Sequence, residues 1–325
     1  MTDERTVLVA GATGRQGGAV ARILLARGYR VRALTRKPNS SAAHRLKRLG
    51  AEVRAGDLEA RGSVVRAAEG ADALFAVSTP FEAGIEAEVR QGMALAEAAK
   101  EAEVGHLVYS SAASADRNTG IPHFESKYAV ERHIALLGIP STVIGPVAFF
   151  ENVVSPWRLP GLQKGMLAAT LPPHRQVQQI AVADIGAFAA LVLERREEFL
   201  GRRVDIASER VNGAEQAEIL SRVTGRKIRY VELPIERRGR QGDTNRSVYD
   251  ADIEGLRHEY PEVGWHTFES WATEQDWRVL DAQEATSASA RTTEGALEPD
   301  PAEGGEGSGD LVRQTGRGPG AADGG

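Results

Sequence analysis

Short hydrophobic runs alternate with longer amphipathic stretches along the first half of the chain. The runs cover residues 7–10, 31–34, 53–55, 73–77, 107–109 and 142–144. Short buried strands that alternate with helices indicate βαβ units, in which a parallel sheet is covered by helices on both faces. The pattern therefore predicts an α/β fold, a doubly wound parallel sheet of the Rossmann type, over residues 1–152.

The pattern changes after residue 152. Proline and glycine interrupt the next stretch, and helical and strand-like segments follow up to a tryptophan-rich end near residue 277. We expect residues 153–280 to form a smaller substrate-binding lobe, with strands that return to the main sheet. From residue 281 to residue 325, few large apolar side chains remain to offset the entropy of ordering. This last stretch is predicted to be a disordered tail.

Composition narrows the range of functions for these 325 residues. A net charge of −5 offers no general attraction for phosphates, so we expect no nucleic acid among the partners. The absence of cysteine excludes disulfides and thiolate catalysis, and the histidines show no metal-ligand spacing, so no metal is predicted. No run reaches the roughly 20 apolar residues of a membrane helix, and the charged start lacks the apolar core of a secretory signal. A cytoplasmic location is expected.

A glycine-rich loop joins the first predicted strand to the first predicted helix. Its G-x-x-G-x-x-G spacing makes these residues candidate ligands of a dinucleotide: Gly11, Thr13, Gly14, Arg15, Gln16 and Gly17. The first glycine permits a tight turn, the second lets the backbone approach a pyrophosphate, and the third lets helix and strand pack closely. The helix N-terminus would face the phosphates with unpaired N–H groups. The alternative is a glycine-rich turn that binds nothing.

The residues that follow the second strand distinguish the two nicotinamide dinucleotides. NAD-preferring proteins place an Asp or Glu here to hold the ribose 2′-hydroxyl, whereas this chain carries Arg36 and Lys37. A guanidinium suits a 2′-phosphate, so NADP(H) is favoured and NAD(H) is the alternative. A solvated basic surface would also explain the pair. Asp57 and Leu58, at the end of the third strand, are expected near the adenine, although an Asp is also common in turns.

Four segments together carry a resemblance to a known family. They are Gly11 to Gly17 (GATGRQG), residues 56–58 (GDL), residues 123–127 (HFESK) and residues 149–152 (FFEN). In this order they resemble the NmrA-like family, a branch of the atypical short-chain dehydrogenase/reductase superfamily, over about residues 5–280. Only the glycine-rich loop is informative by itself. The resemblance implies a Rossmann fold that binds NAD(P).

Typical members of that superfamily carry a Ser at the end of the fifth strand and a Tyr-x-x-x-Lys motif on the next helix. By the resemblance, Ser110 and Ser111 stand at the serine position and Lys127 at the lysine, but His123 replaces the tyrosine. A spacing of four residues puts His123 and Lys127 on one helix face. The resemblance implies that Lys127 holds the nicotinamide ribose, that a serine polarises the substrate oxygen and that His123 manages the proton.

The histidine at position 123 changes the chemistry of such a site. Its ordinary pKa of about 6.5 suits proton transfer, but a neighbouring ammonium group would lower that pKa and leave the imidazole mostly neutral. His123 would then serve as a base more easily than as an acid. The alternative for His123 is a polar cap or a pocket residue with satisfied hydrogen bonds.

Two functions follow from the resemblance. The first is an NAD(P)H-dependent oxidoreductase that acts on a small organic substrate, such as a quinone, a ketone or an aromatic polyketide. The second is a non-catalytic NADP(H) redox sensor or regulator that acts through a protein partner. Phe149, Phe150 and Asn152 follow the sixth strand at the edge where open α/β sheets bind ligands, so they are candidate substrate contacts. Core packing would explain the two phenylalanines equally well. The oligomeric state stays open.

Overall fold

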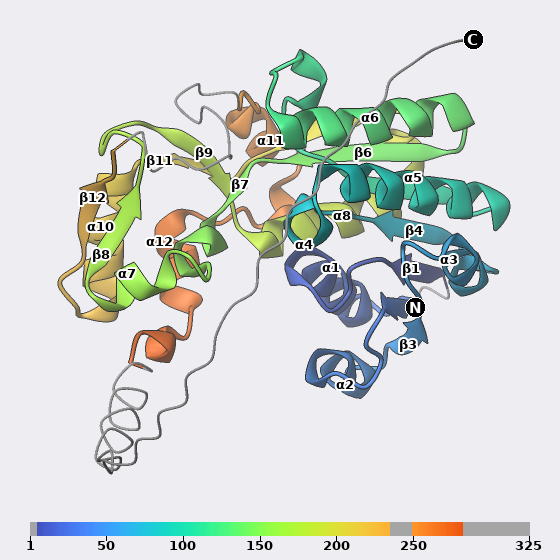
Figure 1. Ribbon diagram of the computed structural model, residues 1–325, viewed down its shortest axis with the longest axis horizontal. Helices are drawn as coiled ribbons and strands as arrows, with labels where there is room; N and C mark the ends of the chain where they lie inside the picture. Colours follow the sequence, from blue (N-terminus) through green and yellow to red (C-terminus); the bar gives the residue numbers. More distant parts are fainter. Residues whose placement is uncertain (1–4, 235–248, 282–325) are drawn as a thin grey trace, which may run out of the picture. The chain divides into compact units, whose positions relative to one another are not determined.

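The computed structural model describes residues 5–234 and 249–281, and within them the central feature is a seven-stranded sheet (Figure 1). Its strands lie in the order β10-β6-β5-β4-β1-β2-β3, and every neighbouring pair is parallel. Their bounds are β1 Thr6–Val9, β2 Arg30–Thr35, β3 Glu52–Ala55, β4 Ala73–Ala76, β5 His106–Ser110, β6 Ser141–Pro146 and β10 Arg203–Ile206. The strand order reverses between β1 and β4, which is where open α/β sheets bind ligands. The predicted doubly wound fold is confirmed.

Helices cover both faces of this sheet. Val7 and Val9 of β1 belong to one hydrophobic cluster, whereas Leu8 between them belongs to the other. The first cluster lies under α1 Arg15–Ala26, α2 Ser41–Arg48, α8 Val182–Glu194, α9 Arg196–Phe199 and α11 Ile253–Glu259. The second lies under α3 Arg61–Ala68, α5 Ile85–Glu101 and α6 Pro122–Leu137. Burial on both faces explains why strands such as β4 are apolar at every position.

The second half of the chain contributes to both the main sheet and a smaller lobe. α8 and β10 complete the main layers, whereas the lobe has its own sheets, in the orders β11-β9-β7 and β12-β8. Its strands are β7 Ala148–Phe149, β8 Met166–Ala169, β9 Val177–Ile180, β11 Glu209–Val211 and β12 Arg229–Glu232, and its helices are α7 Leu159–Gln163, α10 Gly213–Thr224 and α12 Phe268–Glu274. A third hydrophobic cluster fills this lobe. The division predicted at residue 152 stays a prediction, and the predicted disordered tail lies outside the described residues from residue 282 onward.

Candidate functional site

The glycine-rich loop turns tightly between β1 and α1. The Gly14 N–H donates to the Gly11 carbonyl at 2.8 Å, and Gly11 has a φ of +62°, in the left-handed region that favours glycine. A Cβ at Gly17 would lie 2.4 Å from the Gly11 carbonyl oxygen, closer than real Cβ contacts come. The helix can therefore begin this close to the strand only with glycine at position 17.

The N-terminus of α1 offers a place for an anion. Gly14 provides no side-chain cap, and the first turn of α1 contains no acidic residue. The N–H groups of the first turn and the positive end of the helix dipole therefore suit a phosphate. Arg15 is exposed at this end of the helix, and the next residue, Gln16, accepts a hydrogen bond from Ser110 Oγ at 2.7 Å.

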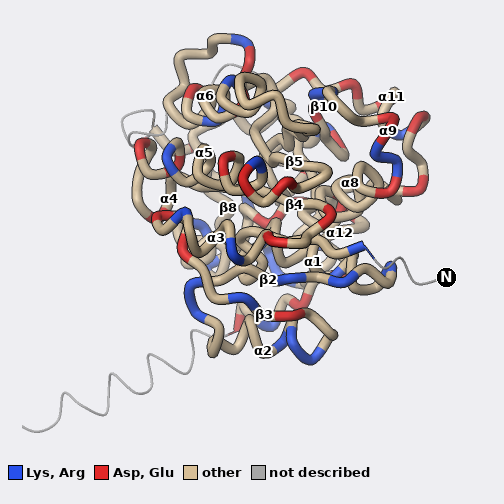
Figure 2. The backbone as a smooth tube through the Cα atoms, turned by 90° about the vertical axis from the view of Figure 1, so that its right-hand side faces the viewer, with Lys and Arg blue, Asp and Glu red and all other residues tan. Residues whose placement is uncertain are grey.

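The basic pair predicted to bind a 2′-phosphate lies at the carboxyl end of β2. Arg36 and Lys37 are exposed, in a region where Lys and Arg gather around β2 and α2 (Figure 2). Thr13 Oγ1 lies 3.5 Å from Thr35 Oγ1, so the pair adjoins the glycine-rich loop. The Arg36 guanidinium forms an ion pair with Glu82, which lies on the short helix α4, residues 80–83. Sequence reasoning missed Glu82, because it follows no motif and is 46 residues from Arg36.

Asp57 and Leu58 follow β3 in a tight turn. Asp57 Oδ1 accepts a hydrogen bond from the Glu59 N–H at 3.0 Å. The Gly56 N–H donates to the Thr35 carbonyl at 3.1 Å, which holds this turn beside the end of β2. The Asp57 side chain thus stabilises its own turn, and the contact of Asp57 and Leu58 with an adenine stays a prediction.

The two serines that follow one another at the end of β5 have different partners. Ser110 is fully buried, and its hydroxyl donates to Gln16 Oε1 at 2.7 Å. The Ser111 hydroxyl instead donates to the carboxylate of Glu131 on α6. That carboxylate forms an ion pair with Arg203 of β10, with Nε of the arginine 2.9 Å from Oε2 of Glu131. Burial raises the pKa of Glu131, and the Arg203 guanidinium opposes that shift. The predicted substrate contact of Ser111 conflicts with this buried network, and Ser110 is the serine that adjoins the glycine-rich loop.

His123 lies in the first turn of α6 and is half-buried. Its ring packs edge-on against Phe124, with ring centres 4.6 Å apart. Burial lowers the pKa of His123, and the nearby Lys127 ammonium lowers it further. The imidazole is therefore neutral at neutral pH, although burial rather than Lys127 is the larger cause. A neutral imidazole accepts a proton more readily than it donates one.

Lys127 is buried, and its ammonium group has partners on three sides. Nζ donates to the carbonyl groups of Ser78 at 2.6 Å and Ser110 at 3.3 Å, and it lies 3.2 Å from Glu88 Oε1. Nζ also lies 5.5 Å from the centre of the Tyr109 ring. Since Ser78 follows β4 and Ser110 ends β5, Lys127 joins the carboxyl ends of two central strands. Its contact with a nicotinamide ribose stays a prediction.

Sequence reasoning missed Glu88, although its position carries a signal. Glu88 has no exposed surface and lies on the buried face of α5, four residues before Gly92 and seven before Leu95. A carboxylate on such a face needs a buried partner, because an unpaired charge is strongly disfavoured in the interior. The spacing shows that a partner is needed, but it does not identify Lys127 as that partner.

The three candidate substrate contacts lie in different surroundings. Phe150 has no exposed surface, and its ring centre lies 5.4 Å from that of Phe268 and 5.8 Å from that of Trp271. Core packing therefore accounts for Phe150, whose side chain offers no surface to a ligand. Phe149 and Asn152 are half-buried, and their contact with a substrate stays a prediction.

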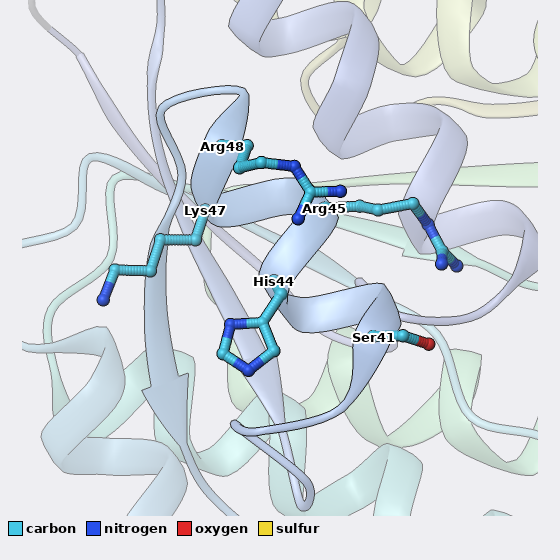
Figure 3. Close-up of a pocket in the computed structure, with 5 residues that line it drawn as sticks. All are labelled: Ser41, His44, Arg45, Lys47 and Arg48. Carbon is cyan, nitrogen blue, oxygen red and sulfur yellow. The ribbon is translucent and has the colours of Figure 1, made fainter.

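Two hollows in the surface are lined by other residues than those of the candidate site. One, of about 550 Å³, is on α2, where the side chains that line it diverge from a single helix (Figure 3). Its lining residues are Ser41, His44, Arg45, Lys47 and Arg48. The other, of about 230 Å³, lies beside His106 at the amino ends of the strands. Parallel sheets bind ligands at their carboxyl edge, which excludes the second hollow. The first is lined by one helix alone and contains none of the candidate residues.

Residues 5–234 and 249–281 contain no group of three or more His, Asp or Glu side chains that is placed to hold a metal ion. In that part of the chain, no helix is both long enough and apolar enough to cross a membrane.

The strand order and the glycine-rich loop define a Rossmann-type α/β protein whose loop lies at the switch point of the sheet. A profile of the NmrA-like family matches residues 3–246. The chain therefore belongs to the NmrA-like family, which confirms the resemblance seen in the four sequence segments.

Known relatives include both enzymes and a regulator. The chain is 28% identical over 248 residues to an NmrA-like family domain-containing protein of Dictyostelium discoideum, a match that covers 71% of this chain and 82% of that protein. It is 30% identical over 259 residues to the oxidoreductase malD of Malbranchea aurantiaca, covering 71% and 76%. It is 28% identical over 275 residues to the nitrogen metabolite repression protein of Neurospora crassa, covering 72% and 56%.

Solved structures share the fold. The negative transcriptional regulator NmrA has a TM-score of 0.71 and 21% identity, covering 88% of this chain and 98% of that one. The same regulator in complex with NADP has a TM-score of 0.70 and 22% identity, covering 87% and 98%. The Citrobacter sp. triphenylmethane reductase complexed with NADP(H) has a TM-score of 0.62 and 22% identity, covering 90% and 96%. At these identities the likeness shows the fold alone.

Proposed function

We propose that this protein is an NADP(H)-dependent oxidoreductase that acts on a small organic substrate, such as a quinone, a ketone or an aromatic polyketide. The observation that carries the proposal is the meeting of the glycine-rich loop with Ser110 and Lys127 at the carboxyl edge of the sheet. Ser110 Oγ donates to Gln16 of the loop, and the Ser110 carbonyl accepts from Lys127. Since His123 lies one helical turn before Lys127, a cofactor bound on the loop would adjoin a group able to exchange a proton.

The residues present fit a dinucleotide with a 2′-phosphate. Glycine at position 17 leaves open the space that a Cβ would fill beside the Gly11 carbonyl, and the N–H groups of the first turn of α1 suit the pyrophosphate. Arg36 and Lys37 supply two cations for the 2′-phosphate. The complexes of NmrA with NADP and of the Citrobacter reductase with NADP(H) support this assignment. NmrA was also solved with NAD, so NAD(H) is the alternative cofactor.

The chain's own residues would divide the work of proton handling and orientation. The nicotinamide supplies or accepts the hydride when bound. Lys127 would hold the ribose, and His123 would take the proton of a substrate hydroxyl. Ser110 would orient the substrate oxygen after its buried hydroxyl turns away from Gln16. Because the pKa of His123 is lowered by burial and by Lys127, its imidazole is ready to act as a base at neutral pH. Carbonyl reduction needs the imidazolium instead, so we expect reduction to become faster as the pH falls.

Single-turnover kinetics test the proposal. Oxidation of bound NADPH is followed by absorbance across a panel of quinones and ketones, for the wild type, His123→Ala and Lys127→Ala. We expect His123→Ala to slow turnover by roughly 10²- to 10⁴-fold, the usual contribution of a positioned acid or base. His133→Ala, on the same helix but paired with Glu97, is the matched control and should keep the wild-type rate. Tight NADPH binding by the wild type and by His123→Ala, with no turnover of any compound, would refute the proposal that the protein is an enzyme.

A non-catalytic NADP(H) sensor that acts through a protein partner is the second candidate. It is favoured by the replacement of the family tyrosine by His123, and by the regulators among the relatives. A sensor must bind NADP⁺ and NADPH with different affinities, since a ligand shifts a conformational equilibrium only by differential binding. Equal affinities, together with identical hydrogen-exchange patterns of the two complexes, would exclude it. The cytoplasmic location and the lack of nucleic-acid binding stay predictions.

A further inference from the structure

A buried ion pair lies beside the candidate site. The Glu88 side chain has no exposed surface, that of Lys127 is 10% exposed, and Nζ of the lysine lies 3.2 Å from Oε1 of the carboxylate. An ammonium group has three N–H donors and no acceptor. Three acceptors surround this one, namely the Glu88 carboxylate and the carbonyl groups of Ser78 and Ser110. Lys127 therefore donates two hydrogen bonds to carbonyl groups and has Glu88 as the counterion of its charge.

Glu88 also contacts the segment of α6 that carries His123. Ser126 Oγ donates to Glu88 Oε2 at 2.5 Å, and the same hydroxyl lies 3.2 Å from the His123 carbonyl oxygen. Helices α5 and α6 pack along each other, so Glu88 reaches Ser126 and Lys127 from the facing helix (Figure 1). Each of its two carboxylate oxygens thus has one partner on α6.

The charged and titratable groups that face Lys127 come from three elements. Glu88 faces it from α5, Tyr109 from β5, and both Glu131 and His123 from α6. Burial lowers the pKa of Lys127, and the Glu88 carboxylate opposes that shift more than Glu131 does. Lys127 is in turn the second cause, after burial, of the lowered pKa of His123. Lys127 therefore stands between the two groups, 3.2 Å from the Glu88 carboxylate and one helical turn after His123 on α6.

We propose that Glu88 is a positioning residue that keeps Lys127 charged, directs its ammonium group to the ends of β4 and β5, and through it adds to the cost of protonating the half-buried His123. The inference rests on the proposed function, because His123 and Lys127 are the residues that function employs. Without the carboxylate, the buried ammonium would lose its counterion, and burial would favour the neutral amine. A neutral amine would no longer oppose protonation of His123. Glu88 thus acts on the proton chemistry without touching the substrate.

An NMR titration of His123 tests this coupling in the cofactor-free protein. Glu88→Gln keeps the size of the side chain and removes its charge; the amide oxygen can face Lys127, and the NH2 group then donates to Ser126 Oγ instead of accepting from it. Lys127→Met shows how far the pKa of His123 rises when the ammonium is absent, and the spectrum of His123→Ala assigns the resonance. Ser126→Ala is the matched control, because it deletes one hydrogen bond to Glu88 and leaves both charges in place.

We expect Glu88→Gln to raise the pKa of His123 by at least half of the rise seen in Lys127→Met, and Ser126→Ala to leave it unchanged. An unchanged or lower pKa of His123 in Glu88→Gln would overturn the proposal, because Lys127 would then keep its charge without Glu88. No rise in Lys127→Met would overturn it as well, since the coupling to His123 would be absent.

Thermal unfolding covers the case in which Glu88→Gln does not fold well enough for NMR. Removal of one member of a buried ion pair leaves the other unpaired, whereas removal of both does not. We expect the double variant Glu88→Gln/Lys127→Met to have a higher Tm than Glu88→Gln. A Tm equal to or below that of Glu88→Gln would overturn the proposal.

The titration tests the role of Glu88, and the cofactor assays test the proposed function, so either proposal can be refuted without the other. A protein that shows the expected titration of His123 but does not bind NADPH would refute the proposed function and support the role of Glu88. If the protein oxidises NADPH but Glu88→Gln leaves the pKa of His123 unchanged, the result would support the proposed oxidoreductase activity and refute the role of Glu88.

Discussion

Glu82 holds Arg36 where a 2′-phosphate is expected, so we predict that this carboxylate competes with NADPH. The ion pair lies at the surface, with the Arg36 side chain 57% and the Glu82 side chain 62% exposed. Pairs this exposed contribute roughly 0 to 1 kcal/mol, because water and salt screen them. A cost of about 1 kcal/mol for their separation corresponds to about a fivefold change in affinity. Glu82→Gln should therefore tighten NADPH binding by about two- to fivefold.

Fluorescence titrations with NADPH and NADH measure this effect. The affinity for NADH should stay unchanged, because NADH has no 2′-phosphate to pair with the released guanidinium. Glu86→Gln is the matched control, since Glu86 is an exposed carboxylate four residues farther along the chain that forms no ion pair with the described residues. The gain for NADPH should shrink at high salt. An equal gain for NADH, or an equal gain in Glu86→Gln, would refute the competition.

The double variant shows whether the effect passes through Arg36. In an Arg36→Ala background, Glu82→Gln should leave NADPH affinity unchanged, because the cation for which both anions compete is gone. Arg36→Ala by itself should weaken NADPH binding relative to NADH. If it leaves the ratio of the two affinities unchanged, Arg36 does not contact the 2′-phosphate and the preference for NADP(H) is wrong.

Three further changes test other parts of the structure. Gly17→Ala places a Cβ 2.4 Å from the Gly11 carbonyl oxygen, so urea unfolding should show that the free energy of unfolding falls by roughly 1–3 kcal/mol. NADPH binding should be lost as well, and wild-type binding would contradict this geometry. Ser110→Ala should weaken NADPH binding, whereas Ser111→Ala should lower only the Tm, and slower turnover in Ser111→Ala would contradict its structural role. Burial lowers the pKa of His106 to about 4, so between about pH 6.5 and pH 4 this histidine is protonated in the unfolded chain but not in the folded protein. The free energy of unfolding should therefore fall by up to roughly 3 kcal/mol as the pH drops through this range. Urea unfolding of His106→Gln should show a smaller dependence on pH, and an unchanged dependence would contradict this assignment.

The parts of the molecule that local geometry determines could be predicted from the sequence. β4 is apolar at all its positions because helices cover both of its faces, and that continuous run marks a buried parallel strand. The glycine-rich loop could also be predicted, since Gly11 needs a left-handed φ and Gly17 has no room for a Cβ. Both requirements involve only neighbouring backbone, so they appear directly as residue types at fixed spacing.

Contacts between distant segments could not be predicted in this way. Phe150 follows the sixth strand at the expected edge, but its burial depends on Phe268 and Trp271, which are more than a hundred residues away. The two serines of β5 are adjacent in sequence, yet Ser111 meets Glu131 while Ser110 meets Gln16. Residue type shows that such side chains need partners, and only the three-dimensional fold shows which partners they have.

Two cations of the candidate site already have carboxylate partners, and burial determines what a ligand does to each pair. Arg36 and Glu82 are mostly exposed, so water replaces their contact at little cost, and we expect a phosphate to separate them. Lys127 and Glu88 are buried, so separation would leave charges without water or a counterion, and we expect this pair to persist when the cofactor binds. The affinity for the 2′-phosphate is therefore adjustable through surface charge at Glu82. The charge beside His123 depends instead on a buried carboxylate, which binding at the surface does not displace.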